Sequence, residues 1–161
     1  MKYEQFRIRA GEKPNLKKQP TDFTGDYKGD KAAAKLDLAR NVERLAELQE
    51  VLYAQNKYAL LIVLQAMDAG GKDGLIRHVL SGVNPQGVNA VSFKQPSAEE
   101  LDHDFLWRIS KNLPERGKIG VFNRSHYEDV LVVRVHPEIV EKQPLPDEVK
   151  NDKNLKNRKS P

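Results

Sequence analysis

A short apolar segment that runs directly into a glycine-rich turn constrains this chain of 161 residues more than any other feature. Residues 58–65, Tyr-Ala-Leu-Leu-Ile-Val-Leu-Gln, are almost continuously apolar and too short for an independent helix, which is typical of a β-strand buried on both faces. The turn at 65–74 reads Gln-Ala-Met-Asp-Ala-Gly-Gly-Lys-Asp-Gly, and a helix is predicted from Gly74 to Leu80. A strand, a glycine-rich turn and a helix in this order favour a parallel sheet.

The rest of the chain alternates in the same way. We predict a long amphipathic helix over 31–56, strands over 88–93 and 119–122, and a helix over 97–113 capped by Ser97. Residues 127–135 have no clear period, and we favour helix over strand there. The fold class is therefore α/β: a P-loop kinase-like parallel sheet with helices on both faces, of which only the N-terminal half, about three strands, is visible.

Charge and composition bound the organisation and the partners. The chain is predicted to be an arm (1–30), one α/β domain (31–140) and a flexible polar tail (141–161), with no packed element after Pro137. Six basic and two acidic residues lie in 1–20, and five and one in 150–161, so the net +4 leaves −4 for residues 21–149. Because the excess of basic over acidic residues lies at the two ends, the sequence argues against a nucleic-acid-binding face.

Other composition features concern the compartment. The longest apolar run is Ala59–Leu64, far short of a membrane helix, and the N-terminus lacks the apolar core of a signal peptide. The chain has no cysteine, so it has neither disulfides nor a thiolate metal site. We therefore expect a cytoplasmic protein with no membrane partner.

The glycine-rich turn is the first candidate site. Its glycines allow backbone amides to approach a phosphate chain, and Lys72 adds positive charge at the start of a helix. The match to the P-loop pattern is imperfect, because Ala66 replaces the first glycine and Asp73 the serine or threonine. Because a carboxylate repels phosphate unless a divalent cation lies between them, Asp68 indicates Mg²⁺. An ordinary tight turn is the alternative. Predicted substrate-binding residues here are Ala69, Gly70, Gly71, Asp73 and Gly74.

A second candidate segment follows the predicted strand at 119–122, where open α/β sheets present polar groups to ligands. Arg124 can contact phosphate oxygens, Asn123 stands where a magnesium-holding Asp is common, and Glu128 with Asp129 can bind metal or nucleotide. Ordinary helix capping by Ser125 with Glu128 is the alternative. Lys94 and Arg108 are further substrate-binding candidates, because they flank the second strand and the third helix.

The remaining chemistry-bearing residues show no site pattern. The four histidines, His78, His103, His126 and His136, have neither metal-ligand spacing nor a partner nucleophile elbow. Phe105 and Trp107 are expected in the core rather than as a base-stacking platform.

Taken together, two segments resemble the polyphosphate kinase 2 family, nucleotide phosphotransferases that use inorganic polyphosphate as donor. They are LQAMDAGGKDGLIRHVLSGVNPQGVNAVSFKQPSAEELDHDFLWR and GKIGVFNRSHYEDVLVVRVHPE, and the resemblance covers residues 21–140. The form FNRSHYEDVLVVRVH is similar to the branch that phosphorylates AMP, whereas the ADP-preferring branch tends to carry FDRSWYNR. The resemblance implies Mg²⁺-dependent transfer to AMP, with ADP as a second acceptor.

The resemblance also implies roles for individual residues. Asp68 and Lys72 would be the Walker A metal and phosphate groups, Asn123 and Arg124 would fall at the Walker B position, and Asp129 would hold metal on the acceptor side beside Glu128. Catalytic roles thus fall to Asp68, Lys72 and Arg124. Family members continue for about another hundred residues with lid arginines, so the chain looks truncated after residue 140.

Two other functions are left open by the sequence. A truncated chain could bind polyphosphate or nucleotide without turnover. An ATP-dependent nucleoside-monophosphate kinase shares the P-loop, but Asp73 in place of Ser or Thr disfavours it. Because a three-stranded sheet exposes unpaired edges, we expect self-association into a homo-oligomer.

Overall fold

The computed structural model describes residues 4, 7–15, 17, 19–20, 22–136 and 138–151. The chain divides into two compact units, Met1–Asn41 and Val42–Pro161, with the boundary inside helix α1 (Lys31–Gln55). This helix confirms the one predicted over 31–56. In the first unit α1 follows the 3₁₀ turn η3 (Gly25–Tyr27), and the Asp30 carboxylate accepts hydrogen bonds from the backbone N–H groups of Ala32 and Ala33 at 3.1 and 3.0 Å.

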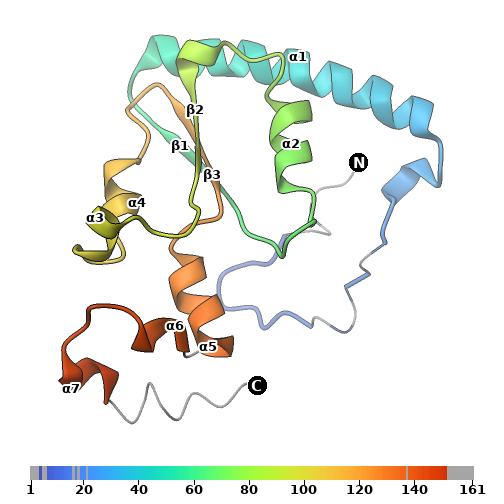
Figure 1. Ribbon diagram of the computed structural model, residues 1–161. Coiled ribbons are helices and arrows are strands. Elements are labelled where there is room, and N and C mark those ends of the chain that lie inside the picture. Colours follow the sequence, from blue (N-terminus) through green and yellow to red (C-terminus); the bar gives the residue numbers. More distant parts are fainter. Residues whose placement is uncertain are drawn as a thin grey trace. The chain divides into compact units, whose positions relative to one another are not determined.

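The second unit contains a three-stranded parallel sheet, as predicted (Figure 1). Its strands are β1 (Leu60–Leu64), β2 (Val88–Ser92, preceded by the 3₁₀ turn η4, Pro85–Gly87) and β3 (Ile119–Asn123), in the order β1-β3-β2. In the register, Asn123 pairs with Leu64 on one side and Ser92 on the other. All three strands therefore end together, and the loops that follow them meet at one edge.

The central strand β3, rather than β1, is the buried one. All five residues of β3 are buried, whereas Leu60, Leu61 and Val63 of β1 are 47%, 37% and 38% exposed. The prediction that residues 58–65 are buried on both faces is therefore wrong. The reason is position in the sheet: β1 is an edge strand, and β3 is covered by a neighbour on each side.

Helices cover both faces of the sheet, as predicted. On one face Phe122 packs with Phe93 and with Ile109 of α4 (Trp107–Lys111), the two phenyl rings meeting edge-on at 4.8 Å. On the other face Asn123 reaches Asp73 of α2 (Lys72–Val79). Figure 1 accordingly shows α2 and α4 on opposite sides of the sheet.

The helix predicted over 97–113 is two short helices, α3 (Ala98–Leu101) and α4. Ser97 caps α3 as expected, and together with Glu100 it forms a capping box. The second helix begins just after Asp104. The Asp104 side chain accepts a hydrogen bond from the N–H of Leu106 at 2.9 Å, and its carbonyl oxygen accepts one from the N–H of Trp107 at 2.8 Å. The core placement of Phe105 is wrong, since this side chain is 42% exposed.

The segment after β3 is helical, as favoured, but it opens with the π-helical turn η5 (Glu128–Val132) before α5 (Val133–Val135). Two short helices follow, α6 (Glu138–Glu141) and α7 (Asp147–Lys150), where no packed element was predicted. Pro146 and two acidic residues at the start of α7 favour this turn. Residues 152–161 of the predicted tail lie outside the described residues.

The predicted division into arm, domain and tail stays a prediction. Among the helices that the structure describes, none combines the length and apolar character needed to cross a membrane.

Candidate functional site

A cavity of about 570 Å³ lies at the carboxyl edge of the sheet. The glycine-rich turn, the end of β2 and the end of β3 surround it, because the three strands finish in register. The structure brings ten of the predicted site residues to this cavity and adds Ser92. Its lining consists of Asp68, Ala69, Gly70, Gly71, Lys72, Asp73, Gly74, Ser92, Lys94, Asn123 and Arg124.

The turn before α2 depends on two of the three glycines found in residues 65–74. A Cβ at Gly70 would lie 2.9 Å from both the Ala66 Cβ and the Met67 carbonyl oxygen, so only glycine allows this close approach. Gly71 precedes α2 with φ of 82°, in the left-handed region that favours glycine. A Cβ at Gly74 would meet open space, so its role is not steric.

The ammonium group of Lys72 lies over the same turn. It donates hydrogen bonds to the carbonyl oxygens of Ala66 and Met67, both at 2.8 Å. An ammonium has three donors, so one remains for a ligand in the cavity. Lys72 thus fixes the shape of the turn and supplies positive charge to it.

Arg124 is held in an unusual conformation at the end of β3. Its φ is 67°, a left-handed value uncommon for a residue other than glycine, and its backbone N–H donates to the Leu64 carbonyl at 2.9 Å. Ala69, across the same cavity, is also left-handed, with φ of 60°. Such conformations cost free energy and cluster at functional sites, which makes this cavity the leading candidate.

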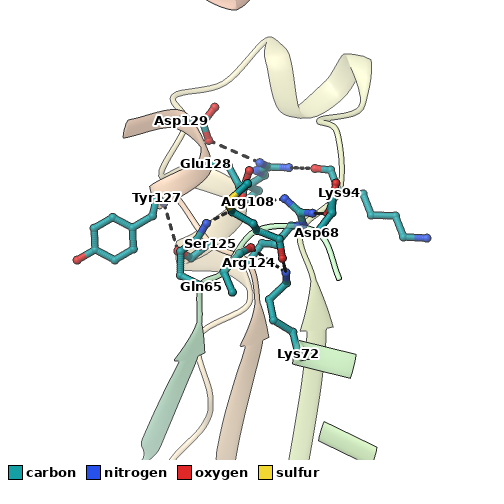
Figure 2. Close-up of polar contacts among 12 residues, drawn as sticks. Gln65, Asp68, Lys72, Lys94, Arg108, Arg124, Ser125, Tyr127, Glu128 and Asp129 are labelled. Atoms are coloured by element: carbon teal, nitrogen blue, oxygen red, sulfur yellow. Dashed lines mark hydrogen bonds and ion pairs between the residues drawn. The ribbon is translucent and has the colours of Figure 1, made fainter. Parts of the chain in front are cut away.

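The guanidinium of Arg124 bridges two carboxylates. One nitrogen donates to Asp68, and another donates to Oε1 of Glu128 at 3.0 Å. The bond to Glu128 raises the pKa of Arg124 further above its ordinary value, so the guanidinium stays charged. Figure 2 shows Arg124 between the two acidic groups at the ends of the strands, with Lys72 beside them.

Sequence reasoning missed Gln65, the side chain that supports Glu128. Gln65 donates to Glu128 Oε1 at 2.7 Å and accepts from the hydroxyl of Ser125 at 3.4 Å. Ser125 is fully buried and also accepts a hydrogen bond from the N–H of Tyr127 at 3.2 Å, so it caps the turn. The Glu128 side chain meets Gln65 and Arg124. A polar residue at the last position of an apolar strand segment was the available signal for Gln65.

Arg108 does not reach this cavity, although it was predicted to bind substrate. Its side chain is only 5% exposed; it donates to the Lys94 carbonyl at 2.9 Å and pairs with Glu100 and Asp129 at 3.7 and 3.6 Å. It also lies over the Phe93 ring. Lys94 does line the cavity, but in Figure 2 its ammonium points away from Arg124.

Asp129 faces a second cavity, of about 410 Å³, away from Asp68. Successive helical residues point in different directions, so Glu128 meets Arg124 while Asp129 meets Arg108. Burial is the main cause that raises the pKa of Asp129, and the nearby Arg108 opposes it. The second cavity is lined by Pro96, Glu100, Leu101, His103, Asp104, Phe105, Arg108, Asp129, Val130, Val133, Gln143, Pro144, Leu145 and Val149.

The first cavity offers oxygen ligands suited to Mg²⁺. The Asp68 side chain is 91% exposed, and Asn123 donates to Asp73 at 2.6 Å while its own side-chain oxygen has no hydrogen-bond partner among the described residues. Within those residues no three side chains of the His, Cys, Asp and Glu types cluster as a metal site. One or two carboxylates completed by ligand phosphates and water are what Mg²⁺ ordinarily uses, so Asp68 and its neighbours fit this ion.

A parallel sheet with a glycine-rich turn between β1 and α2, and cationic groups at its carboxyl edge, defines the class of α/β proteins built to hold phosphate groups there. Residues 28–152 match the family described as Polyphosphate kinase 2 (PPK2), and the chain belongs to that family.

Named relatives agree with this assignment. The chain is 56% identical over 147 residues to the ADP-polyphosphate phosphotransferase of Rhodopseudomonas palustris, covering 91% of this chain and 50% of the relative. It is 50% identical over 132 residues to the AMP/ADP-polyphosphate phosphotransferase of Meiothermus ruber, covering 82% and 49%. The chain therefore spans about half the length of the curated relatives it matches.

A solved structure shows the same fold. The crystal structure of Polyphosphate Kinase 2 from Arthrobacter aurescens TC1 matches with a TM-score of 0.76 and 43% identity, over 96% of this chain and 52% of that one. The fold class and the family resemblance drawn from the sequence are both confirmed.

Proposed function

We propose that the chain transfers a phosphoryl group from inorganic polyphosphate to a nucleotide, with AMP as the expected acceptor and ADP as the second. The observation that carries the proposal is the cavity in which Lys72 and Arg124 meet at the glycine-rich turn. The relatives named for polyphosphate phosphotransfer to ADP, or to AMP and ADP, support it.

The described residues offer groups suited to this reaction. An oxygen of the acceptor's terminal phosphate attacks the terminal phosphorus of polyphosphate, and the bond from that phosphorus to the remaining chain breaks. The attacking oxygen is already anionic, so no strong base is required, and no histidine is among the described residues that line the cavity. Positioning and charge neutralisation then dominate, and both are within reach of Lys72, Arg124 and the amides of the turn.

Asp68 is the group we propose for holding Mg²⁺, with Asp73 and Asn123 beside it. The ion would neutralise charge on the transferring phosphate when bound. Asp68 also pairs with Arg124, so it connects the place of the metal with the guanidinium that contacts phosphate. Asp129, the other predicted metal ligand, lies on the second cavity and is not included in this proposal.

The second cavity is where we place the base and sugar of the acceptor. Its walls are largely apolar, and its polar groups include the carboxylates of Glu100, Asp104 and Asp129, which accept hydrogen bonds from amino and hydroxyl groups. A Leu101→Trp variant, which narrows this cavity, should raise the KM for the nucleotide about tenfold and leave the KM for polyphosphate unchanged. Equal changes in both constants would contradict the placement.

Product analysis of the purified chain tests the function. Long-chain polyphosphate or ATP is offered as donor, with AMP, ADP or no acceptor, and Lys72→Ala is run beside the wild type. We expect ADP from AMP with polyphosphate, and a loss of about 100-fold or more in the variant. ATP as the sole working donor would instead select a nucleoside-monophosphate kinase, and binding of polyphosphate without product would select a binding fragment.

A further inference from the structure

Gln65 joins the end of β1 to the arginine at the end of β3. Its amide nitrogen donates to Glu128 Oε1 at 2.7 Å, and Arg124 donates to the same oxygen at 3.0 Å. The amide oxygen of Gln65 is itself engaged by the Ser125 hydroxyl at 3.4 Å. Gln65 is half-buried, so both ends of its amide are fixed by neighbours from the β3 side of the site (Figure 2).

The two carboxylates that hold Arg124 are not equivalent. The Asp68 side chain is 91% exposed, whereas that of Glu128 is 20% exposed and has the Gln65 amide as a second partner. A cation that engages Asp68, or a phosphate that competes with it, weakens the Asp68 contact to Arg124. Glu128 then remains the group that orients the guanidinium, and its own orientation depends on Gln65.

We propose that Gln65 is a positioning residue that acts through Glu128 to keep Arg124 directed into the cavity. The inference rests on the proposed phosphotransfer. It assigns Gln65 an indirect effect on turnover, because Gln65 is not among the described residues that line the cavity and contacts Arg124's partner Glu128 instead.

A Gln65→Glu variant tests this role through its pH dependence. It places a second carboxyl about as close to Glu128 as the amide is now, and two carboxylates at such a distance cannot both ionise freely, so they share a proton at lower pH. A protonated Glu at position 65 donates to Glu128 as the amide does. We expect the rate to be about tenfold below wild type at pH 8 and to approach it as the pH falls towards about 6.

The matched control is Gln55→Glu, which adds the same charge at an exposed position at the end of α1. It should follow the wild-type pH profile throughout. A second experiment exchanges the hydrogen-bond donor and acceptor. In the double variant Gln65→Glu/Glu128→Gln, the amide now at position 128 donates to the carboxylate now at position 65. This double variant should be faster at pH 8 than either single variant, which a purely structural defect would not produce.

Thermal unfolding of each variant and activity of the wild type complete the test. If the wild type transfers phosphate and Gln65→Glu matches it at every pH, the inference is overturned and the proposed function stands. If Gln65→Glu is slow at every pH and the double variant is slower still, the positioning role is likewise overturned. No transfer by the wild type overturns both proposals together.

Discussion

The surroundings of Arg124 and Arg108 are the instructive contrast in this molecule. Each guanidinium pairs with a carboxylate of η5, Arg124 with Glu128 and Arg108 with Asp129. The Arg124 side chain is 28% exposed and lines the first cavity, whereas that of Arg108 is 5% exposed and binds a carbonyl, two carboxylates and an aromatic face. Burial and the number of partners separate an arginine available to phosphate in the first cavity from one that mainly holds the fold at the wall of the second cavity.

The largest expected effect is on turnover at Arg124. Arg124→Met should reduce the rate of transfer by about 100-fold or more, because it removes a preorganised charge beside the reacting phosphate. Its free energy of unfolding should change by less than about 1 kcal/mol, since its partners are partly exposed. Steady-state kinetics and urea unfolding on the same preparation measure both. A variant that loses stability but keeps its rate would reverse the contrast.

Arg108→Met should mainly lower stability, with a smaller effect on turnover that acts through the acceptor, because Arg108 lines the second cavity. Removing this guanidinium leaves Asp129 and Glu100 without their buried partner, which we expect to cost about 3 kcal/mol of unfolding free energy. Urea denaturation gives the value directly. A loss below about 1 kcal/mol, together with a rate defect as large as that of Arg124→Met, would mean that Arg108 serves the ligand as the sequence predicted.

The glycines of the turn provide a smaller comparison of the same kind. Gly70→Ala forces a Cβ to within 2.9 Å of Ala66 and the Met67 carbonyl, so the turn must open. We expect about tenfold weaker polyphosphate binding, measured by titration calorimetry. Gly74→Ala, the comparison variant, should lose less affinity than Gly70→Ala and gain about 0.5–1 kcal/mol of stability, because Gly74 lies within α2 and its Cβ would meet open space. Equal losses in both variants would contradict this division.

The smallest expected effect is the pH dependence of stability at Asp129. Burial raises its folded-state pKa above the ordinary value of 3.8. The folded state therefore keeps the proton on Asp129 to a higher pH than the unfolded state does. The contribution of Asp129 to the free energy of unfolding is greatest below the ordinary pKa and is lost as the pH rises through the folded-state pKa. Asp129→Asn should make the free energy of unfolding, measured by urea denaturation, less dependent on pH between the ordinary and the folded-state pKa. The same pH dependence in wild type and variant would show that the Asp129 carboxyl does not contribute to it.

The sequence was sufficient for the parts that local patterns determine. Apolar runs and the glycine turn located all three strands and α2, and parallel pairing followed from their alternation with helices. The strand order was not encoded locally, so the buried strand was misplaced at β1 instead of β3. The break between α3 and α4 depends on the Asp104 side chain accepting from Leu106, a contact that competes with helix continuation.

The site residues also differ in whether local sequence patterns could predict them. Residues within the glycine turn could be named from the sequence because their spacing carries the chemistry. The placement of Arg108 and Asp129 at the second cavity could not be predicted, because burial and the direction of a side chain on a helical turn decide it. Gln65 was overlooked because its importance lies in a contact with Glu128, 63 residues away.

The most direct test of the account is the affinity of the chain for polyphosphate. Titration calorimetry would compare the wild type with Lys72→Ala, Arg124→Met and the control Lys111→Ala, whose exposed ammonium lies over Trp107 outside the cavity. We predict binding that weakens about tenfold or more in each of the first two variants and is unchanged in the control. Equal weakening in all three, or none in Lys72→Ala and Arg124→Met, would contradict the assignment of this cavity to polyphosphate.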